Sequence, residues 1–110
     1  MKIIRIIILL LIIACNNSNH KSDIQILNNT EFASILKAIH LTEAKNILQK
    51  PTNIDSLTLS NQYDSIFQAH NIQEEIFHQS MEYYLQNPKE LEVIYDSILV
   101  DLRSHPSYLR

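Results

Sequence analysis

Apolar side chains recur at helical spacing over residues 71–102, and this pattern predicts two helices that meet at Asn87-Pro88. One broad side of the first of these helices is formed by Ile72, Ile76, Phe77, Met81 and Tyr84. In the second helix, the residues at the spacing of an amphipathic face are Leu91, Ile94, Tyr95, Ile98, Leu99 and Leu102. The pair holds most of the aromatic residues, so we expect the rest of the domain to pack on it.

Two further helices are predicted upstream of this pair. The first opens at Asn28, runs to about Gln49 and is stopped by Pro51. Its apolar stripe consists of Phe32, Ile35, Leu36, Ile39 and Ile47. The second runs from about Asp55 to His70, with a face made of Leu59, Tyr63, Ile66, Phe67 and His70. Three helix starts carry an Asn followed three residues later by an acid, the capping-box pattern: Asn28 with Glu31, Asn71 with Glu74, and Asn87 with Glu90.

The pattern favours an all-α fold. No segment alternates apolar and polar residues with period two, so no strand is predicted. The connections around Asn71 and Asn87 are only a residue or two long, and such tight connections favour steep crossings over side-by-side packing. We therefore predict a compact orthogonal bundle of about four short helices.

The beginning of the chain has a different pattern. A short basic start is followed by a continuously apolar run that ends at Ala14. This run is well short of the roughly 20 residues that a membrane-spanning helix needs, so it is typical of a cleaved signal peptide. We interpret 1–14 as the signal peptide, 15–28 as a flexible tether, and 29–105 as the helical domain.

The only cysteine, Cys15, follows the apolar run directly, in the string Ile-Ile-Ala-Cys. This string resembles the lipobox of bacterial lipoproteins, and the resemblance implies that Cys15 becomes the first mature residue and carries lipid chains. Two or more acyl chains hold a protein stably on a bilayer. The polar stretch from Asn16 to Asp23 has no acid before its last residue, unlike the acid-rich surface-export signal of Bacteroidota lipoproteins. The chain therefore resembles an outer-membrane lipoprotein that faces the periplasm.

Composition excludes several classes of function. The chain of 110 residues has no Gly, so it cannot form a P-loop, a dinucleotide fingerprint, a nucleophile elbow or an EF-hand loop. Without the signal peptide the domain keeps 7 basic and 12 acidic residues. This acidic balance argues against nucleic acid as a partner, because binding to phosphates needs basic side chains. Its five His residues show no metal-binding spacing, so we expect no metal and no cofactor.

His40 and Glu43 are the best candidates for chemistry, because they lie one helical turn apart and toward the apolar stripe. A carboxylate beside an imidazole can orient it as a general base. The simpler interpretation is a buried hydrogen-bonded pair that fixes the first helix against the others. In that case, removing one partner should cost about 1–3 kcal/mol of stability. No nucleophile with a spacing that points to this pair is visible.

A second candidate site is a partner-binding surface at Tyr83, Asn87 and Pro88. Pro88 fixes φ at the first position of the last helix, and Asn87 is expected to cap it, so the corner should be rigid. Tyr83 lies one turn earlier, about 100° around the helix from Tyr84, which is expected to be buried. A rigid aromatic beside polar residues suits a contact site. The alternative is that Tyr83 only packs on the last helix.

Three patches taken together resemble a known family. They are the string Ile39 to Ala44, the spaced aromatic and His pattern from Tyr63 to Tyr84, and the segment Asn87 to Asp96. They resemble the small Bacteroidota lipoproteins grouped as domain of unknown function 4296. Members often carry Asp where this chain has Ala38, and Gly where it has Asn71. The resemblance implies a location and a fold, and it supplies no activity.

The sequence is compatible with two functions. The first is a lipid-anchored, periplasm-facing module of the cell envelope that binds a protein partner without catalysis. The second is a small envelope hydrolase or isomerase that uses His40 and Glu43. The absence of Gly loops and of a second domain that could form a cleft favours the first.

Overall fold

The computed structural model describes residues 23–49 and 54–109, and its regular structure is entirely helical over this part of the chain. The elements are α2 (Asn29–Leu48), α3 (Ser56–Ala69), α4 (Glu74–Gln86), α5 (Pro88–Ser104) and the short 3₁₀ helix η1 (Pro106–Leu109). The prediction of an all-α fold with four helices is confirmed. The signal peptide, Cys15 and the first part of the tether lie outside the described residues.

One helix start, at Asn28, is capped as predicted, and a second is capped by an acid. Asn28 and Glu31 form a full capping box, in which the Glu31 amide donates to Asn28 Oδ1 at 2.9 Å and the Asn28 amide donates to Glu31 Oε2 at 3.3 Å. Asp55 caps α3 by accepting the Thr58 amide at 2.8 Å. These contacts satisfy amides that have no partner within the helix.

The other two capping boxes were wrongly predicted. Helix α4 begins at Glu74 with Gln73 in the cap position, and Asn71 lies in the preceding turn with a φ of 54°. Asn tolerates this left-handed conformation better than most residues, and Gly adopts it freely. The Asn87 side chain donates to the Tyr83 carbonyl at 2.8 Å, so it closes the end of α4 and makes no capping bond to α5.

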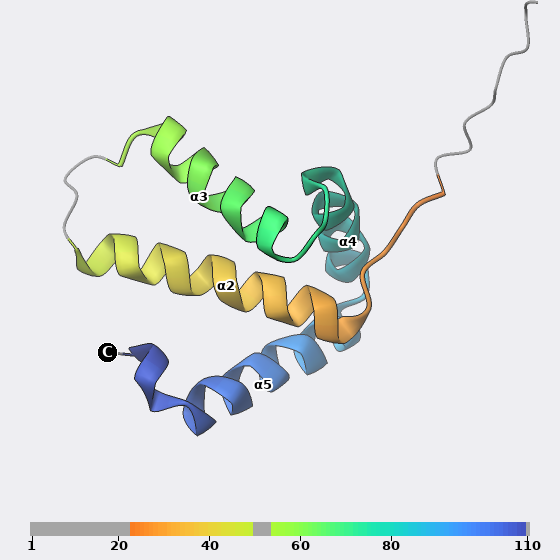
Figure 1. Cartoon of the computed structure of the whole chain (residues 1–110). Coiled ribbons are helices and arrows are strands. Elements are labelled where there is room, and N and C mark those ends of the chain that lie inside the picture. The colour runs from red at the N-terminus through yellow and green to blue at the C-terminus, as the bar shows by residue number, and fades with distance from the viewer. Residues whose placement is uncertain (1–22, 50–53, 110) are drawn as a thin grey trace, which may run out of the picture.

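The helices cross steeply around the short connections, as an orthogonal bundle requires. Figure 1 shows α4 almost end-on, across the right-hand ends of α2 and α3, while α5 runs back beneath α2. Helices α2 and α3 form a hairpin whose arms separate toward residues 50–53. The core therefore covers mainly the first half of α2. This explains why Ile47, predicted to belong to the apolar stripe, is exposed.

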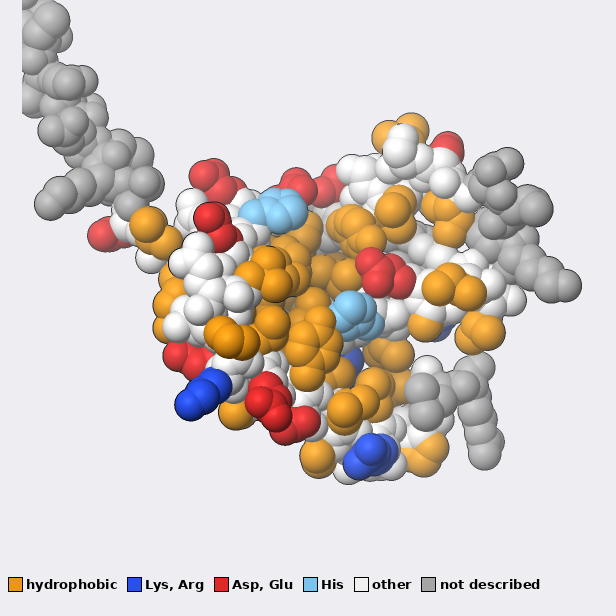
Figure 2. Space-filling model, turned by 180° about the vertical axis from the view of Figure 1, so that it is seen from behind, with side chains coloured by type: hydrophobic (Ala, Val, Ile, Leu, Met, Phe, Trp, Pro, Cys, Tyr) orange, Lys and Arg blue, Asp and Glu red, His pale blue; other side chains and the backbone are white. Residues whose placement is uncertain are grey.

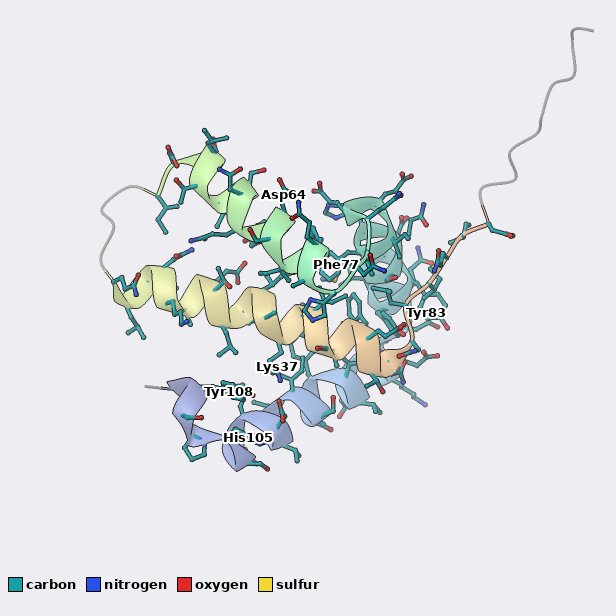
Figure 3. The ribbon with its side chains drawn as sticks, viewed as in Figure 1. Lys37, Asp64, Phe77, Tyr83, His105 and Tyr108 are labelled. Carbon is teal, nitrogen blue, oxygen red and sulfur yellow. The ribbon has the colours of Figure 1, made fainter. Side chains whose placement is uncertain are left out.

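The core is built around four aromatic rings. Phe32 of α2 lies 4.6 Å from Tyr84 and 5.4 Å from Phe77, measured between ring centroids, and Phe67 of α3 lies 5.3 Å from Phe77. Figure 3 shows Phe77 where α2, α3 and α4 meet. The other buried hydrophobic residues are Leu27, Ile35, Leu36, Ile39, Ile94 and Ile98. On α5 the prediction was partly wrong, because Tyr95 and Leu99 remain largely exposed.

The folded unit begins before Asn29, which corrects the predicted boundary of the tether. Leu27 is buried, and its backbone is held by two side chains of α4. Its amide donates to Ser80 Oγ at 2.9 Å, and its carbonyl accepts the Tyr84 hydroxyl at 2.7 Å. Ser80 in turn donates to the Ile76 carbonyl at 2.7 Å. An extended residue is thus built into the core with its polar groups satisfied.

The folded unit also extends past residue 105. Helix η1 follows α5, and its Tyr108 ring lies 5.2 Å from the Lys37 ammonium. Lys37 of α2 also forms an ion pair with Asp101, which is 3.3 Å from His105 Nδ1. Figure 3 shows Lys37 on the side of α2 that faces α5 and Tyr108. The pKa of Asp101 is lowered, mainly by its hydrogen bond to Lys37.

Candidate functional site

His40 and Glu43 form the predicted pair, with His40 Nδ1 3.4 Å from Glu43 Oε2. The expectation that they would be buried was wrong, because their side chains are 46% and 43% exposed. The physical reason is that Ile39 is the last buried residue of α2, which leaves this turn at the edge of the core. The pair therefore borders an open space rather than lying inside the bundle.

Tyrosines from two other helices extend this pair into a chain of polar contacts. The Tyr63 hydroxyl of α3 donates to Glu43 Oε1 at 2.8 Å. On the other side, His40 Nε2 lies 3.4 Å from the Tyr95 hydroxyl of α5. Burial and the hydrogen bond to Glu43 both raise the pKa of Tyr63. The contacts orient the imidazole and the carboxylate from both ends and connect α2 to its two neighbours.

These residues border a groove with a cavity volume of about 270 Å³ that receives side chains from all four helices. Its apolar wall is formed by Leu36, Ile39, Phe67, Phe77 and Met81. Its polar lining consists of His40, Glu43, Tyr63, Glu74, His78 and Tyr95. Figure 2, seen from behind, shows apolar side chains in the hollowed centre of this face, with His and acidic side chains around them. An apolar pocket with a few convergent polar groups is the usual form of a binding site. We call it the central groove.

The α4 side of the central groove carries a second acid–imidazole pair. His78 Nε2 lies 3.1 Å from Glu74 Oε1, and both side chains are largely exposed. Two carboxylates, Glu43 and Glu74, thus lie on different helices at the same groove. Among the described residues, the Lys and Arg side chains are absent from its lining. The lining is therefore acidic when its imidazoles are neutral.

Tyr83, Asn87 and Pro88 lie together at the α4–α5 corner, apart from the central groove. The Tyr83 hydroxyl donates to Glu90 Oε1 at 3.3 Å, and the Glu90 charge raises the pKa of Tyr83. Its ring is 38% exposed and lies edge-on to Tyr84, with centroids 5.1 Å apart. The corner is fixed by the Asn87 bond to the Tyr83 carbonyl. Tyr83 is an exposed aromatic at this corner, but the predicted Asn87 cap on α5 is not formed, and the structure does not bring Tyr83 to His40.

Sequence reasoning missed several residues that build the groove. It treated Tyr63 and Tyr95 as parts of apolar faces, whereas their hydroxyls bond to the His40–Glu43 pair. Their helical spacing gave no signal, because both Tyr positions fall within the apolar stripes of their helices. Met81 and Glu74 could not be linked to the pair without knowing how α4 crosses α2.

A Ser–His contact was also missed. Ser34 Oγ of α2 lies 3.2 Å from His70 Nε2, and His70 Nδ1 donates to the Ile66 carbonyl at 2.8 Å. The geometry resembles an oriented base beside a hydroxyl. However, Ser34 lies inside α2, where backbone amides are used in helical hydrogen bonds and cannot stabilise an oxyanion. The contact is therefore suited to closing the end of α3 and joining it to α2.

Over residues 23–49 and 54–109, no group of three His, Cys, Asp or Glu side chains could hold a metal ion. None of the described helices is long and apolar enough to span a bilayer.

The exposure of the His40–Glu43 pair changes the predicted effect of its removal. Because exposed ion pairs and hydrogen bonds contribute little, His40→Ala should lower the free energy of unfolding by at most about 1 kcal/mol. Urea denaturation of the two proteins measures this difference. A loss of several kcal/mol would mean that the pair is a structural element of the core. An unchanged stability with lost cellular function would assign His40 to the functional site.

A small all-α domain with an open amphipathic groove is the class that this fold and site define. Within that class, the chain belongs to the family described as a domain of unknown function (DUF4296), which matches residues 24–106. The match begins before Leu27 and ends at Pro106, so it includes Leu27, whose amide donates to Ser80 of α4. The comparisons found no match among curated proteins and none among solved structures.

Proposed function

We propose that this protein is a lipid-anchored binding module that faces the periplasm and holds an envelope protein partner in its central groove. The observation that carries the proposal is the groove itself, because α2, α3 and α4 contribute an apolar wall, and hydrogen-bonded polar side chains from all four helices lie around it. Interfaces typically combine a desolvated apolar centre with a polar rim. A binding surface that is already ordered loses little side-chain entropy on association.

The lipid anchor in this proposal rests on the sequence before the domain. Cys15 follows an apolar run that is too short to span a bilayer, in the arrangement of a lipoprotein signal. Between Cys15 and Leu27 the chain can extend over at most about 40 Å. Since Leu27 is fixed in the core, the domain would be held close to the membrane surface. An acidic domain has little electrostatic attraction for anionic lipids, so the anchor would supply the membrane attachment.

The runner-up is an envelope hydrolase or isomerase, and the observation in its favour is the oriented His40–Glu43 pair beside a cavity. Two observations weigh against it. His40 Nε2 faces the Tyr95 hydroxyl, which is a poor nucleophile at neutral pH. The pair is also half exposed, whereas catalytic bases are usually tuned by burial.

The proposal is tested by site-specific photo-crosslinking of the full-length chain in its own cells. The crosslinking residue p-benzoylphenylalanine replaces Tyr95 in the groove or Tyr83 at the α4–α5 corner. Tyr83 is the matched control for Tyr95, because the two residues are 38% and 40% exposed and both lie on helices. We expect position 95 to capture one defined envelope protein, and position 83 to capture little. Cys15→Ala should abolish palmitate incorporation and reduce the capture.

Each result has a separate meaning. Capture from position 83 alone would move the partner surface to the corner formed with Asn87 and Pro88. Absence of capture from both positions would contradict the binding-module proposal. Continued palmitate labelling and membrane fractionation of the Cys15→Ala protein would contradict the anchor alone.

A further inference from the structure

The central groove has a one-sided charge that restricts what can bind there. Its charged and titratable lining residues are His40 and Glu43 from α2, Tyr63 from α3, Glu74 and His78 from α4, and Tyr95 from α5. Two of these are carboxylates, and none of the others is cationic while the imidazoles are neutral. The Lys and Arg side chains seen in Figure 2 lie mainly toward the lower edge of this face.

Helix α2 carries two cations, Lys37 and Lys45, and neither lines the groove. The Lys37 ammonium pairs with Asp101 and lies over the Tyr108 ring, on the side of α2 that faces α5 and η1. It therefore cannot neutralise Glu43 across the helix. A bound group that carries positive charge would therefore complement Glu43 and Glu74.

The groove also limits the size and shape of the bound group. Its cavity of about 270 Å³ is smaller than the roughly 300–1,000 Å³ typical of sites for drug-sized ligands. The groove is also open to solvent at its polar edge, where Glu43 and Glu74 are about half exposed or more. This space suits one large apolar side chain with its neighbours outside. Met81 in the wall adds an adaptable surface for such a side chain.

We propose that the central groove receives one large apolar side chain that is flanked by Lys or Arg in a segment of the partner protein. The apolar side chain lies against Phe67, Phe77 and Met81, and the neighbouring cations approach Glu43 and Glu74. The exposed Tyr95 ring offers a face to one of these cations. This inference rests on the proposed function and adds the chemistry of the partner.

A second copy of the chain is the competing occupant. The α4–α5 corner carries the exposed Leu85 four residues before Lys89, which is the same combination of apolar and basic groups. However, the whole chain has a net charge of −3, and like-charged copies repel each other at low ionic strength. Charge complementarity therefore favours a basic segment of a different protein.

The test uses the full chain in neutral detergent micelles and three synthetic peptides that differ only at their centre. The central sequences are Lys-Phe-Lys, Lys-Ala-Lys and Glu-Phe-Glu, each flanked by Ser and Asn residues. Binding is followed through the ¹⁵N–¹H NMR shifts of groove residues. We expect the Lys-Phe-Lys peptide to shift the amides of His40, Phe77 and Met81. The other two peptides should bind at least about tenfold more weakly, because each lacks one of the two interactions.

Matched variants locate the charge effect. Glu43→Gln and Glu74→Gln should each weaken binding of the Lys-Phe-Lys peptide by about two- to fivefold. Gln at position 43 keeps an oxygen that can accept the Tyr63 hydroxyl, so the fold is retained. Glu92→Gln removes an exposed charge on α5 away from the groove lining and should leave the affinity unchanged.

The contrary outcomes are distinct. Equal binding of Glu-Phe-Glu would overturn the charge inference and leave the proposed binding function intact. Failure of all three peptides would overturn the inference, while crosslinking from position 95 still decides the proposed function. Groove shifts that grow with protein concentration without peptide would identify a second copy as the occupant and overturn the inference.

Discussion

Replacing Leu27 by Ala should lower the free energy of unfolding by about 2–5 kcal/mol, as is typical of a buried Leu in a core. The side chain is only 5% exposed and packs in the same core as the aromatic cluster, although it precedes the first helix. Its removal leaves a cavity between the extended segment and α4. The hydrogen bonds from Ser80 and Tyr84 would then hold the Leu27 backbone without the packing of its side chain in the core.

Ile24→Ala provides the matched control, because Ile24 lies on the same extended segment but is 70% exposed. Its effect should stay within about 0.5 kcal/mol, the usual range for surface substitutions. Urea denaturation of wild type and both variants gives the comparison. Equal, small effects of both substitutions would show that the segment is a tether up to Asn29 after all.

The four helices could be predicted from the sequence because their apolar residues recur at helical spacing, and Phe32 to Ile39 is an example. The position of Leu27 could not be predicted in this way. It belongs to a brief apolar patch with no periodicity, and its burial depends on a Ser and a Tyr more than 50 residues away. Only the tertiary fold connects them.

Capping shows a similar limit. An Asn followed three residues later by an acid was present at three predicted helix starts, and only Asn28 formed the box. Asn28 follows an extended segment, so its side chain is free to bond to the helix ahead. Asn87 stands between two helices and bonds back to Tyr83. A local pattern does not indicate which of two helix ends a polar side chain serves.

Only part of the candidate site could be predicted from the sequence, because the rest depends on how the helices are arranged. The contact between His40 and Glu43 follows from their spacing on one helix. Their exposure does not, because it depends on where the buried part of α2 ends, which is at Ile39. The groove itself combines side chains from four helices, and its charge becomes visible only when Glu43 and Glu74 are placed together.

Tyr84→Phe should lower the free energy of unfolding at neutral pH by about 1–3 kcal/mol, because it leaves a buried acceptor without its donor. The Tyr84 hydroxyl donates to the Leu27 carbonyl at 2.7 Å and lies 2.9 Å from Asn29 Oδ1. The ring keeps its packing against Phe32, so the loss reports the hydroxyl alone. Tyr83→Phe, at the exposed neighbouring position, should change stability by less than about 0.5 kcal/mol.

The pH dependence provides a sharper test of the same contact. Burial, followed by the charges of Glu90, Tyr83 and Glu31, raises the pKa of Tyr84 above its ordinary value of 10.0. A group whose pKa is raised by folding stabilises the protein fully below the unfolded-state pKa. This contribution disappears as the pH rises through the folded-state pKa. Wild type should therefore lose stability above about pH 10 more steeply than Tyr84→Phe, which has no proton to lose there.

The two stability curves should thus converge as the pH is raised, and urea denaturation in steps from pH 7 to about pH 11 measures them. Tyr63 titrates in both proteins, so its own raised pKa cancels in the comparison. A constant difference across this range would mean that the Tyr84 hydroxyl contributes only through packing. A stability difference between the two proteins that narrows as the pH rises would assign the lost stability to the Tyr84 hydroxyl proton. This proton forms the hydrogen bond that joins α4 to Leu27 at the beginning of the folded domain.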